Sequence, residues 1–168
     1  FIQTMNALQK HLCAHQRQAE RRNLDGTIKF NEVIQMSNKL KAGIVGVTGM
    51  VGQRFATLLA DHPYFEIAAI AASGRSAGKT YEEAVEGRWK MSAPIPEAVK
   101  KMTVIDASDI ASMAEKVDFV FCAVDMKKDE IRALEEAYAK AEIPVISNNS
   151  AHRWTDDVPM VIPEINDS

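Results

Sequence analysis

The sequence predicts an α/β fold in which helices cover both faces of a doubly wound parallel sheet. From Met36 onward, short and almost continuously apolar segments alternate with segments of helical periodicity. Strands without regular polar positions are typical of sheets buried on both faces, and helical connections make such sheets parallel. Right-handed crossovers then give a doubly wound sheet, whose ligand site lies at the carboxyl ends of the strands. We expect the strand order 3-2-1-4-5.

The composition excludes several function classes. The chain has 168 residues, 46% of them hydrophobic and 26% charged, which suffices for one globular core. The net charge of −3, without a long run of one sign, argues against a nucleic-acid partner. Two widely separated cysteines, Cys13 and Cys122, favour a cytoplasmic location. No membrane partner and no metal site are expected.

Each expected element follows from its local pattern. Strands are expected at the apolar runs, which are residues 41–47, 65–72, 103–106, 118–123 and 144–147. Helices are expected where apolar residues recur at helical spacing, which are residues 53–61, 110–116 and 128–141. A segment rich in Ser, Gly, Lys and Pro predicts a long loop over residues 73–101.

The two longer helices should each turn one apolar face inward. The inward residues are expected to be Phe55, Leu58 and Leu59 in the first helix, and Ile131, Leu134, Tyr138 and Ala141 in the last. Arg132 and Glu136 should form an i, i+4 pair on the outer face.

The chain divides into three parts. Residues 1–35 are polar, with a weak helical pattern, and form an unassigned N-terminal extension. Residues 36–150 form the expected nucleotide-binding domain. Residues 151–168 are expected to begin the crossover to a further, catalytic domain that these 168 residues do not contain.

Three glycines at regular spacing separate the first expected strand from the first expected helix. Glycine lets the backbone turn sharply and approach a phosphate, and a helix N-terminus offers free N–H groups to an anion. The spacing is GxxGxxG rather than the strict GxGxxG pattern, and glycines also serve plain strand-to-helix packing. At this place in the fold we favour dinucleotide binding. The candidate residues are Gly46, Thr48, Gly49, Met50, Val51 and Gly52.

The end of the second expected strand carries no acidic residue. Enzymes that use NAD normally place Asp or Glu there to bind the ribose hydroxyls. The chain offers a guanidinium, an ammonium and two hydroxyls instead, which suit the additional 2′-phosphate of NADP. The alternative is a solvated loop with incidental charge. The candidate residues are Ser73, Arg75, Ser76 and Lys79.

A run of small polar residues follows the last expected strand and ends in an arginine. Ser-Asn-Asn-Ser-Ala-His-Arg occupies residues 147–153. At the carboxyl end of a strand, such a run could clamp a phosphate or a carboxylate, with Asn148, Asn149 and Ser150 as neutral donors beside Arg153. Taken alone, it fits an ordinary Asn- and Ser-rich turn better, with Arg153 paired to a nearby aspartate.

Together these segments resemble aspartate-semialdehyde dehydrogenases. The likeness runs from Met36 to Asn166. Four segments carry it: Gly-Val-Thr-Gly-Met-Val-Gly-Gln-Arg-Phe (46–55), Ser-Gly-Arg-Ser-Ala-Gly-Lys (73–79), Ser-Asn-Asn-Ser-Ala-His-Arg (147–153) and Val-Pro-Met-Val-Ile-Pro-Glu-Ile-Asn (158–166). The last two are the more specific, because several dehydrogenase families share a glycine loop.

The resemblance implies a Rossmann-type domain and an activity. This family reduces aspartyl 4-phosphate to aspartate 4-semialdehyde with NADPH, on the route to lysine (through diaminopimelate), threonine and methionine, and a homodimer or homotetramer is expected. It implies that the cofactor diphosphate lies on residues 48–51 and the 2′-phosphate near Arg75 and Ser76. Cys122, Ala123 and Asn148 would lie along the cofactor. Arg153 and Ser150 would bind the substrate phosphate.

The resemblance also implies that the reaction needs residues found elsewhere. The family's nucleophilic cysteine and acid/base histidine are expected beyond Ser168, so no catalytic residue is assigned here and these 168 residues should be inactive alone. Cys122 is not that nucleophile, because it lies in an apolar strand without a partner base. The alternatives are N-acetyl-γ-glutamyl-phosphate reductase, which fits residues 147–153 less well, and a non-catalytic nucleotide-binding module.

Overall fold

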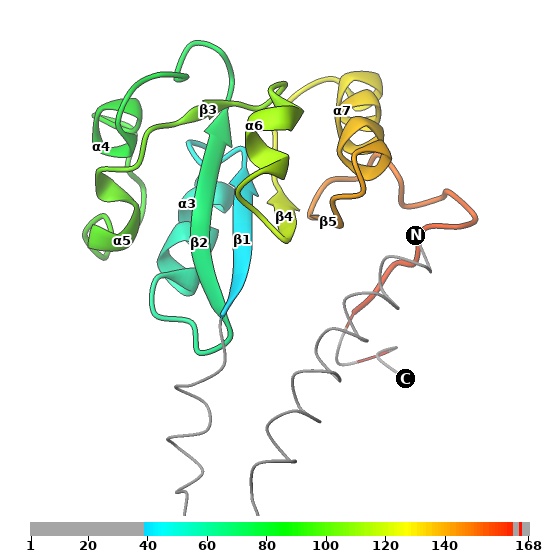
Figure 1. Cartoon of the computed structure of the whole chain (residues 1–168), viewed down its shortest axis with the longest axis horizontal. Helices are drawn as coiled ribbons and strands as arrows, with labels where there is room; N and C mark the ends of the chain where they lie inside the picture. Colours follow the sequence, from blue (N-terminus) through cyan, green and yellow to red (C-terminus); the bar gives the residue numbers. More distant parts are fainter. Residues whose placement is uncertain (1–38, 163–164, 166–168) are drawn as a thin grey trace, which may run out of the picture.

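A single sheet of five parallel strands organises the computed structural model, which describes residues 39–162 and 165 (Figure 1). The strands are β1 (Leu40–Val45), β2 (Phe65–Ala72), β3 (Ile105–Asp106), β4 (Phe119–Cys122) and β5 (Val145–Ser147). Their spatial order is β3-β2-β1-β4-β5, and every pairing is parallel. The predicted fold class and strand order are confirmed. The expected N-terminal extension, residues 1–35, lies outside the described residues.

Helices connect the strands and cover both faces of the sheet. They are α3 (Met50–Leu59), α4 (Tyr81–Ala84), α5 (Glu97–Lys100), α6 (Ile110–Ala114) and α7 (Lys128–Lys140). Neighbouring residues of a strand point to opposite faces. Ile44 accordingly packs in a cluster with side chains of α3, α4 and α5, whereas Val45 packs in a second cluster with side chains of α6 and α7. In the described part of the chain, no helix has the length and hydropathy needed to cross a membrane.

The expected loop over residues 73–101 is partly wrong. It contains α4 and α5, and Tyr81, Val85 and Val99 are completely buried against the sheet. A capping box starts α4: the Thr80 hydroxyl accepts from the Glu83 N–H, and the Glu83 carboxylate accepts from the Thr80 N–H. Helices this short have no full apolar period, so composition alone suggests a loop.

Three smaller expectations also differ from the structure. The first helix begins at Met50 rather than at residue 53, so it includes part of the glycine motif. Leu58 is 55% exposed, because its neighbour Leu59 rather than Leu58 lies on the inward face of α3. Ala141 is exposed because it follows the end of α7 at Lys140. Arg132 does not pair with Glu136. It donates to the Ala151 carbonyl, while Glu136 lies 4.0 Å from the Lys140 ammonium.

Two of the three motif glycines are required by packing within the chain. Gly46 has a φ of 91°, and a Cβ there would lie 2.4 Å from the Ala123 carbonyl oxygen. A Cβ on Gly52 would lie 2.2 Å from the Gly46 carbonyl oxygen, so α3 can start against the end of β1 only with glycine at this position. A Cβ on Gly49 would meet its nearest atom at 3.4 Å, an ordinary contact.

Replacing Gly52 should therefore destabilise the fold, whereas replacing Gly49 should not. We expect Gly52→Ala to lower the free energy of unfolding by about 2 kcal/mol or more, because the added methyl must displace backbone. Gly49→Ala should cost less than about 1 kcal/mol. Urea unfolding of both variants measures the difference, and equal costs would contradict the packing described here.

Buried ionisable groups should make the fold sensitive to alkali. Burial raises the pKa of the Cys122 thiol from 9.0 to about 12, with a further contribution from the nearby Glu135 carboxylate. Burial also raises the pKa values of the Tyr81 and Tyr138 hydroxyls. Since the folded pKa values exceed the unfolded ones, this stabilisation is complete below the unfolded values and is lost as the pH rises above them.

We expect the free energy of unfolding to fall above about pH 9, by up to about 1.4 kcal/mol per pH unit for each group. Urea unfolding between about pH 8 and about pH 11 measures this slope. Tyr138→Phe should make it shallower. A free energy of unfolding that is flat over this range would show that these groups ionise equally in both states.

Candidate functional site

The carboxyl edge of the sheet brings the predicted site segments together. Because the strands are parallel, the segments that follow β1, β2, β4 and β5 all leave the sheet at this edge. Backbone hydrogen bonds extend the sheet pairing into them: Gly46 and Val47 donate to the Ala71 carbonyl, Ala123 donates to the Val45 carbonyl, and Asn148 donates to the Cys122 carbonyl. The three segments singled out in the sequence therefore share one edge.

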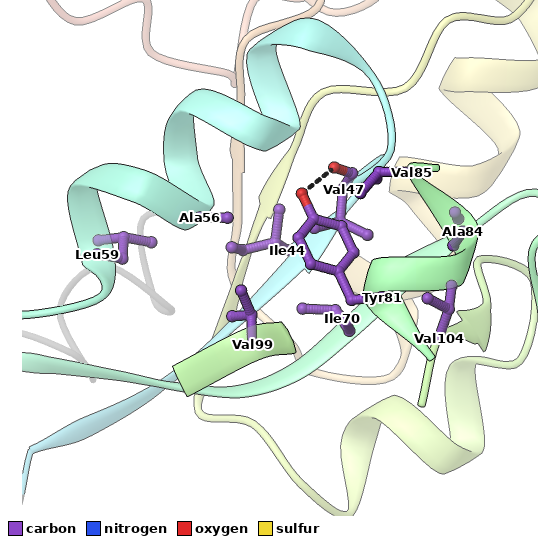
Figure 2. Packing of buried hydrophobic residues seen from close by; sticks show 11 residues of the cluster. Ile44, Val47, Ala56, Leu59, Ile70, Tyr81, Ala84, Val85, Val99 and Val104 are labelled. Atoms are coloured by element: carbon purple, nitrogen blue, oxygen red, sulfur yellow. Dashed lines mark hydrogen bonds between the residues drawn. The ribbon is translucent and has the colours of Figure 1, made fainter. Parts of the chain in front are cut away.

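The glycine turn directs its carbonyl groups into the protein. The Gly46 carbonyl accepts from the Gly49 N–H at 3.1 Å. The Val47 carbonyl accepts from the Tyr81 hydroxyl at 3.0 Å, as Figure 2 shows. The Thr48 carbonyl accepts from the Gln53 side-chain amide at 3.0 Å. Each carbonyl of the turn between β1 and α3 is thus satisfied from inside the chain.

Four N–H groups of the described residues, one in this turn and three at the start of α3, lack such partners. Within residues 39–162 and 165, no acceptor receives the N–H of Thr48, Met50, Val51 or Gly52. No side chain caps the N-terminus of α3, and its first turn carries no acidic residue. Four N–H donors at the positive end of a helix dipole are therefore free to bind an anion. Gly49 places no side chain beside them, although its own packing would allow one.

The turn after β2 presents two cationic side chains. Ser73, Arg75 and Lys79 are exposed there. Ser76 differs from expectation: it is only 4% exposed, and its N–H donates to the Ser73 carbonyl to close the turn. The structure therefore offers Arg75 and Lys79, rather than the Ser76 hydroxyl, to a ligand at this end of the edge.

Cys122 lies in the core rather than along the edge. Its side chain is buried in the cluster formed with α6 and α7, and its raised pKa keeps the thiol protonated near neutral pH. The buried thiol therefore faces away from this edge, and it lacks the exposed, electropositive surroundings of a reactive cysteine. Ala123, the next residue, contacts Gly46 and does adjoin the glycine turn.

A buried carboxylate organises the segment after β5. Glu135 of α7 is 5% exposed and accepts hydrogen bonds from the Ser147 hydroxyl and from the Asn149 side-chain amide, the latter at 3.0 Å. Its second oxygen lies 4.0 Å from Nε2 of His152. Asn149 also donates to the Cys122 sulfur at 3.4 Å. The Asn149 amide therefore faces inward and is not the ligand donor expected from the sequence.

The remaining polar side chains of this segment face outward. Asn148, Ser150 and Arg153 are exposed. No ion pair within the described residues joins Arg153 to Asp156 or Asp157. The alternative that Arg153 only pairs with a nearby aspartate in a surface turn therefore gains no support. Three side chains, Gln53, Tyr81 and Glu135, hold these segments in place and were not identified in the sequence as site residues.

Comparison with known proteins gives one consistent family. Residues 41–168 match the family model described as semialdehyde dehydrogenase, NAD binding domain. The aspartate-semialdehyde dehydrogenase of Aspergillus fumigatus is 43% identical over 128 residues, which are 76% of this chain and 34% of that protein. That of Saccharomyces cerevisiae is 39% identical over 131 residues, 78% of this chain and 34% of that protein.

The solved structures agree. The aspartate-semialdehyde dehydrogenase of Candida albicans, solved with NADP, matches with a TM-score of 0.68 at 39% identity, over 75% of this chain and 34% of that one. This chain thus spans about a third of the length of its relatives. Since the family model matches most of the chain and the strand order is that of its Rossmann-type fold, the chain belongs to the semialdehyde dehydrogenase NAD-binding domain family.

Proposed function

We propose that this chain binds NADP at the carboxyl edge of its sheet. The observation that carries the proposal is the set of free N–H groups on Thr48, Met50, Val51 and Gly52 at the start of α3. A dinucleotide diphosphate has the charge and the acceptor oxygens that such a set recognises. The NADP in the matching Candida albicans structure supports the choice of ligand. When bound, the nicotinamide would supply or accept a hydride.

The choice of NADP over NAD depends on the turn after β2. A 2′-phosphate needs cationic donors, and Arg75 and Lys79 are exposed there. Ser73 occupies the position after β2 where an NAD enzyme usually carries an acid that binds the ribose hydroxyls. A charged carboxylate at that position would repel the 2′-phosphate.

The activity that we propose is reduction of L-aspartyl 4-phosphate to L-aspartate 4-semialdehyde, for which this chain supplies the cofactor-binding part. The names of the relatives support it. Arg153 and Ser150 would bind the substrate phosphate, because both are exposed at the end of the β5 segment. We also propose that the full-length protein forms a homodimer or homotetramer and is located in the cytoplasm. N-acetyl-γ-glutamyl-phosphate reductase and a non-catalytic module are less favoured, since the relatives compared above are aspartate-semialdehyde dehydrogenases.

Arg75→Ala should weaken NADP binding much more than NAD binding. One charge-assisted contact to a phosphate is worth roughly 1.5–3 kcal/mol, or about 10- to 150-fold in the dissociation constant. Titration calorimetry with both cofactors measures the effect. Lys116→Ala is the matched control, because it removes one exposed positive charge near the start of β4, at the opposite edge of the sheet. Equal losses for NADP and NAD would show that Arg75 does not contact the 2′-phosphate.

Arg153→Lys should impair use of the substrate phosphate and leave the cofactor unaffected. Lysine keeps the charge but loses the paired N–H donors that fit a phosphate. In a protein of the relatives' full length, we expect a higher KM for aspartyl phosphate, or for inorganic phosphate in the reverse direction. NADP affinity and Tm should stay nearly unchanged. A lower Tm with an unchanged phosphate KM would assign Arg153 to the structure of the turn instead.

A further inference from the structure

Two buried side chains fix the shape of the glycine turn from inside the protein. Gln53 lies in the first turn of α3, and Tyr81 begins α4. Gln53 is 1% exposed and Tyr81 is fully buried, so neither can touch a cofactor. Both nevertheless hydrogen-bond to the segment that offers its N–H groups to the diphosphate.

The Gln53 side chain can bond in only one orientation. Its Nε2 group donates to the Thr48 carbonyl and to the Arg88 carbonyl, both at 3.0 Å. Its Oε1 atom accepts from the Lys90 N–H at 2.8 Å. Two carbonyls on one side and an N–H on the other require an amide rather than a carboxylate. Gln53 therefore ties the turn to the segment that follows α4.

Tyr81 acts on the neighbouring peptide group. Its hydroxyl donates to the Val47 carbonyl at 3.0 Å, and its ring packs among core residues such as Ile44 and Ile70 (Figure 2). A trans peptide group is planar, with its C=O and N–H pointing in opposite directions. Holding the Val47 carbonyl inward therefore points the Thr48 N–H outward, toward the edge of the sheet.

We propose that Gln53 and Tyr81 are positioning residues for the NADP diphosphate: Tyr81 holds the Val47 carbonyl inward so that the Thr48 N–H faces the anion, and Gln53 anchors the Thr48 carbonyl, which fixes the chain just before the free N–H groups of α3. This inference rests on the proposed function. It predicts that the turn binds the diphosphate without reorganising, because its donors are already oriented. Losing either anchor lets the peptide groups rotate, and binding must then restore their orientation.

The test compares two variants with a matched control. Gln53→Glu places a carboxylate against two carbonyls, and Tyr81→Phe deletes only the hydroxyl. Tyr138→Phe is the control, because its hydroxyl is also buried and donates to a carbonyl, that of Ala107, at 3.0 Å, but on the other face of the sheet. Calorimetry measures affinity for NADP, NMR titration measures affinity for 2′-AMP, which lacks the diphosphate, and thermal unfolding gives Tm.

Gln53→Glu and Tyr81→Phe should each weaken NADP binding by about tenfold or more, and change 2′-AMP binding by less than about twofold. Tyr138→Phe should lower Tm as much as Tyr81→Phe and leave NADP affinity unchanged. Equal losses for NADP and 2′-AMP, or unchanged NADP affinity in the folded variants, would overturn the inference. If Gln53→Glu does not fold, Tyr81→Phe decides. Failure of the unsubstituted chain to bind NADP would instead overturn the proposed function, and this inference with it.

Discussion

The close approach of Gly52 to the Gly46 carbonyl is the constraint on which the glycine turn depends. It lets α3 start directly on the end of β1, which any side chain at position 52 would prevent. The free N–H groups of the turn consequently lie at the end of the central strand, beside the Ala123 segment that follows β4. The chain leaves β1 toward β2 on one side and returns through β4 on the other, so this is also the point where the strand order reverses.

The sheet was predictable because its strands are buried on both faces. The almost continuously apolar run of residues 65–72 identifies β2 with its observed bounds. Because crossovers between parallel strands are right-handed, only a few strand orders are possible. α4 and α5 were not found, because helices of four residues show no apolar period. The capping pattern from Thr80 to Glu83 was the one local signal for α4. Leu58 was misplaced because successive residues lie about 100° apart around a helix, and α3 turns Leu59 rather than Leu58 toward the core.

The residues of the site that face the ligand were more predictable than the buried residues that hold them in place. Glycines between a strand and a helix report directly on backbone geometry, so residues 46–52 could be assigned from their spacing. Gln53 and Tyr81 bond to residues 35 and 34 positions away, which no local pattern shows. In residues 147–153, polar side chains alternate between the Glu135 side and the exposed side. Only the path of the chain after β5 distinguishes the inward Asn149 from the outward Asn148.

The central claim is that a preformed set of backbone N–H donors binds the cofactor diphosphate. It is tested most directly by an ¹H–¹⁵N correlation spectrum of this chain, recorded during a titration with NADP. The amide resonances of Thr48, Met50, Val51 and Gly52 should show the largest shifts and saturate together, because each N–H acquires an acceptor that it lacks in the free chain. Saturable shifts elsewhere on the sheet, with these four resonances unmoved, would contradict the claim.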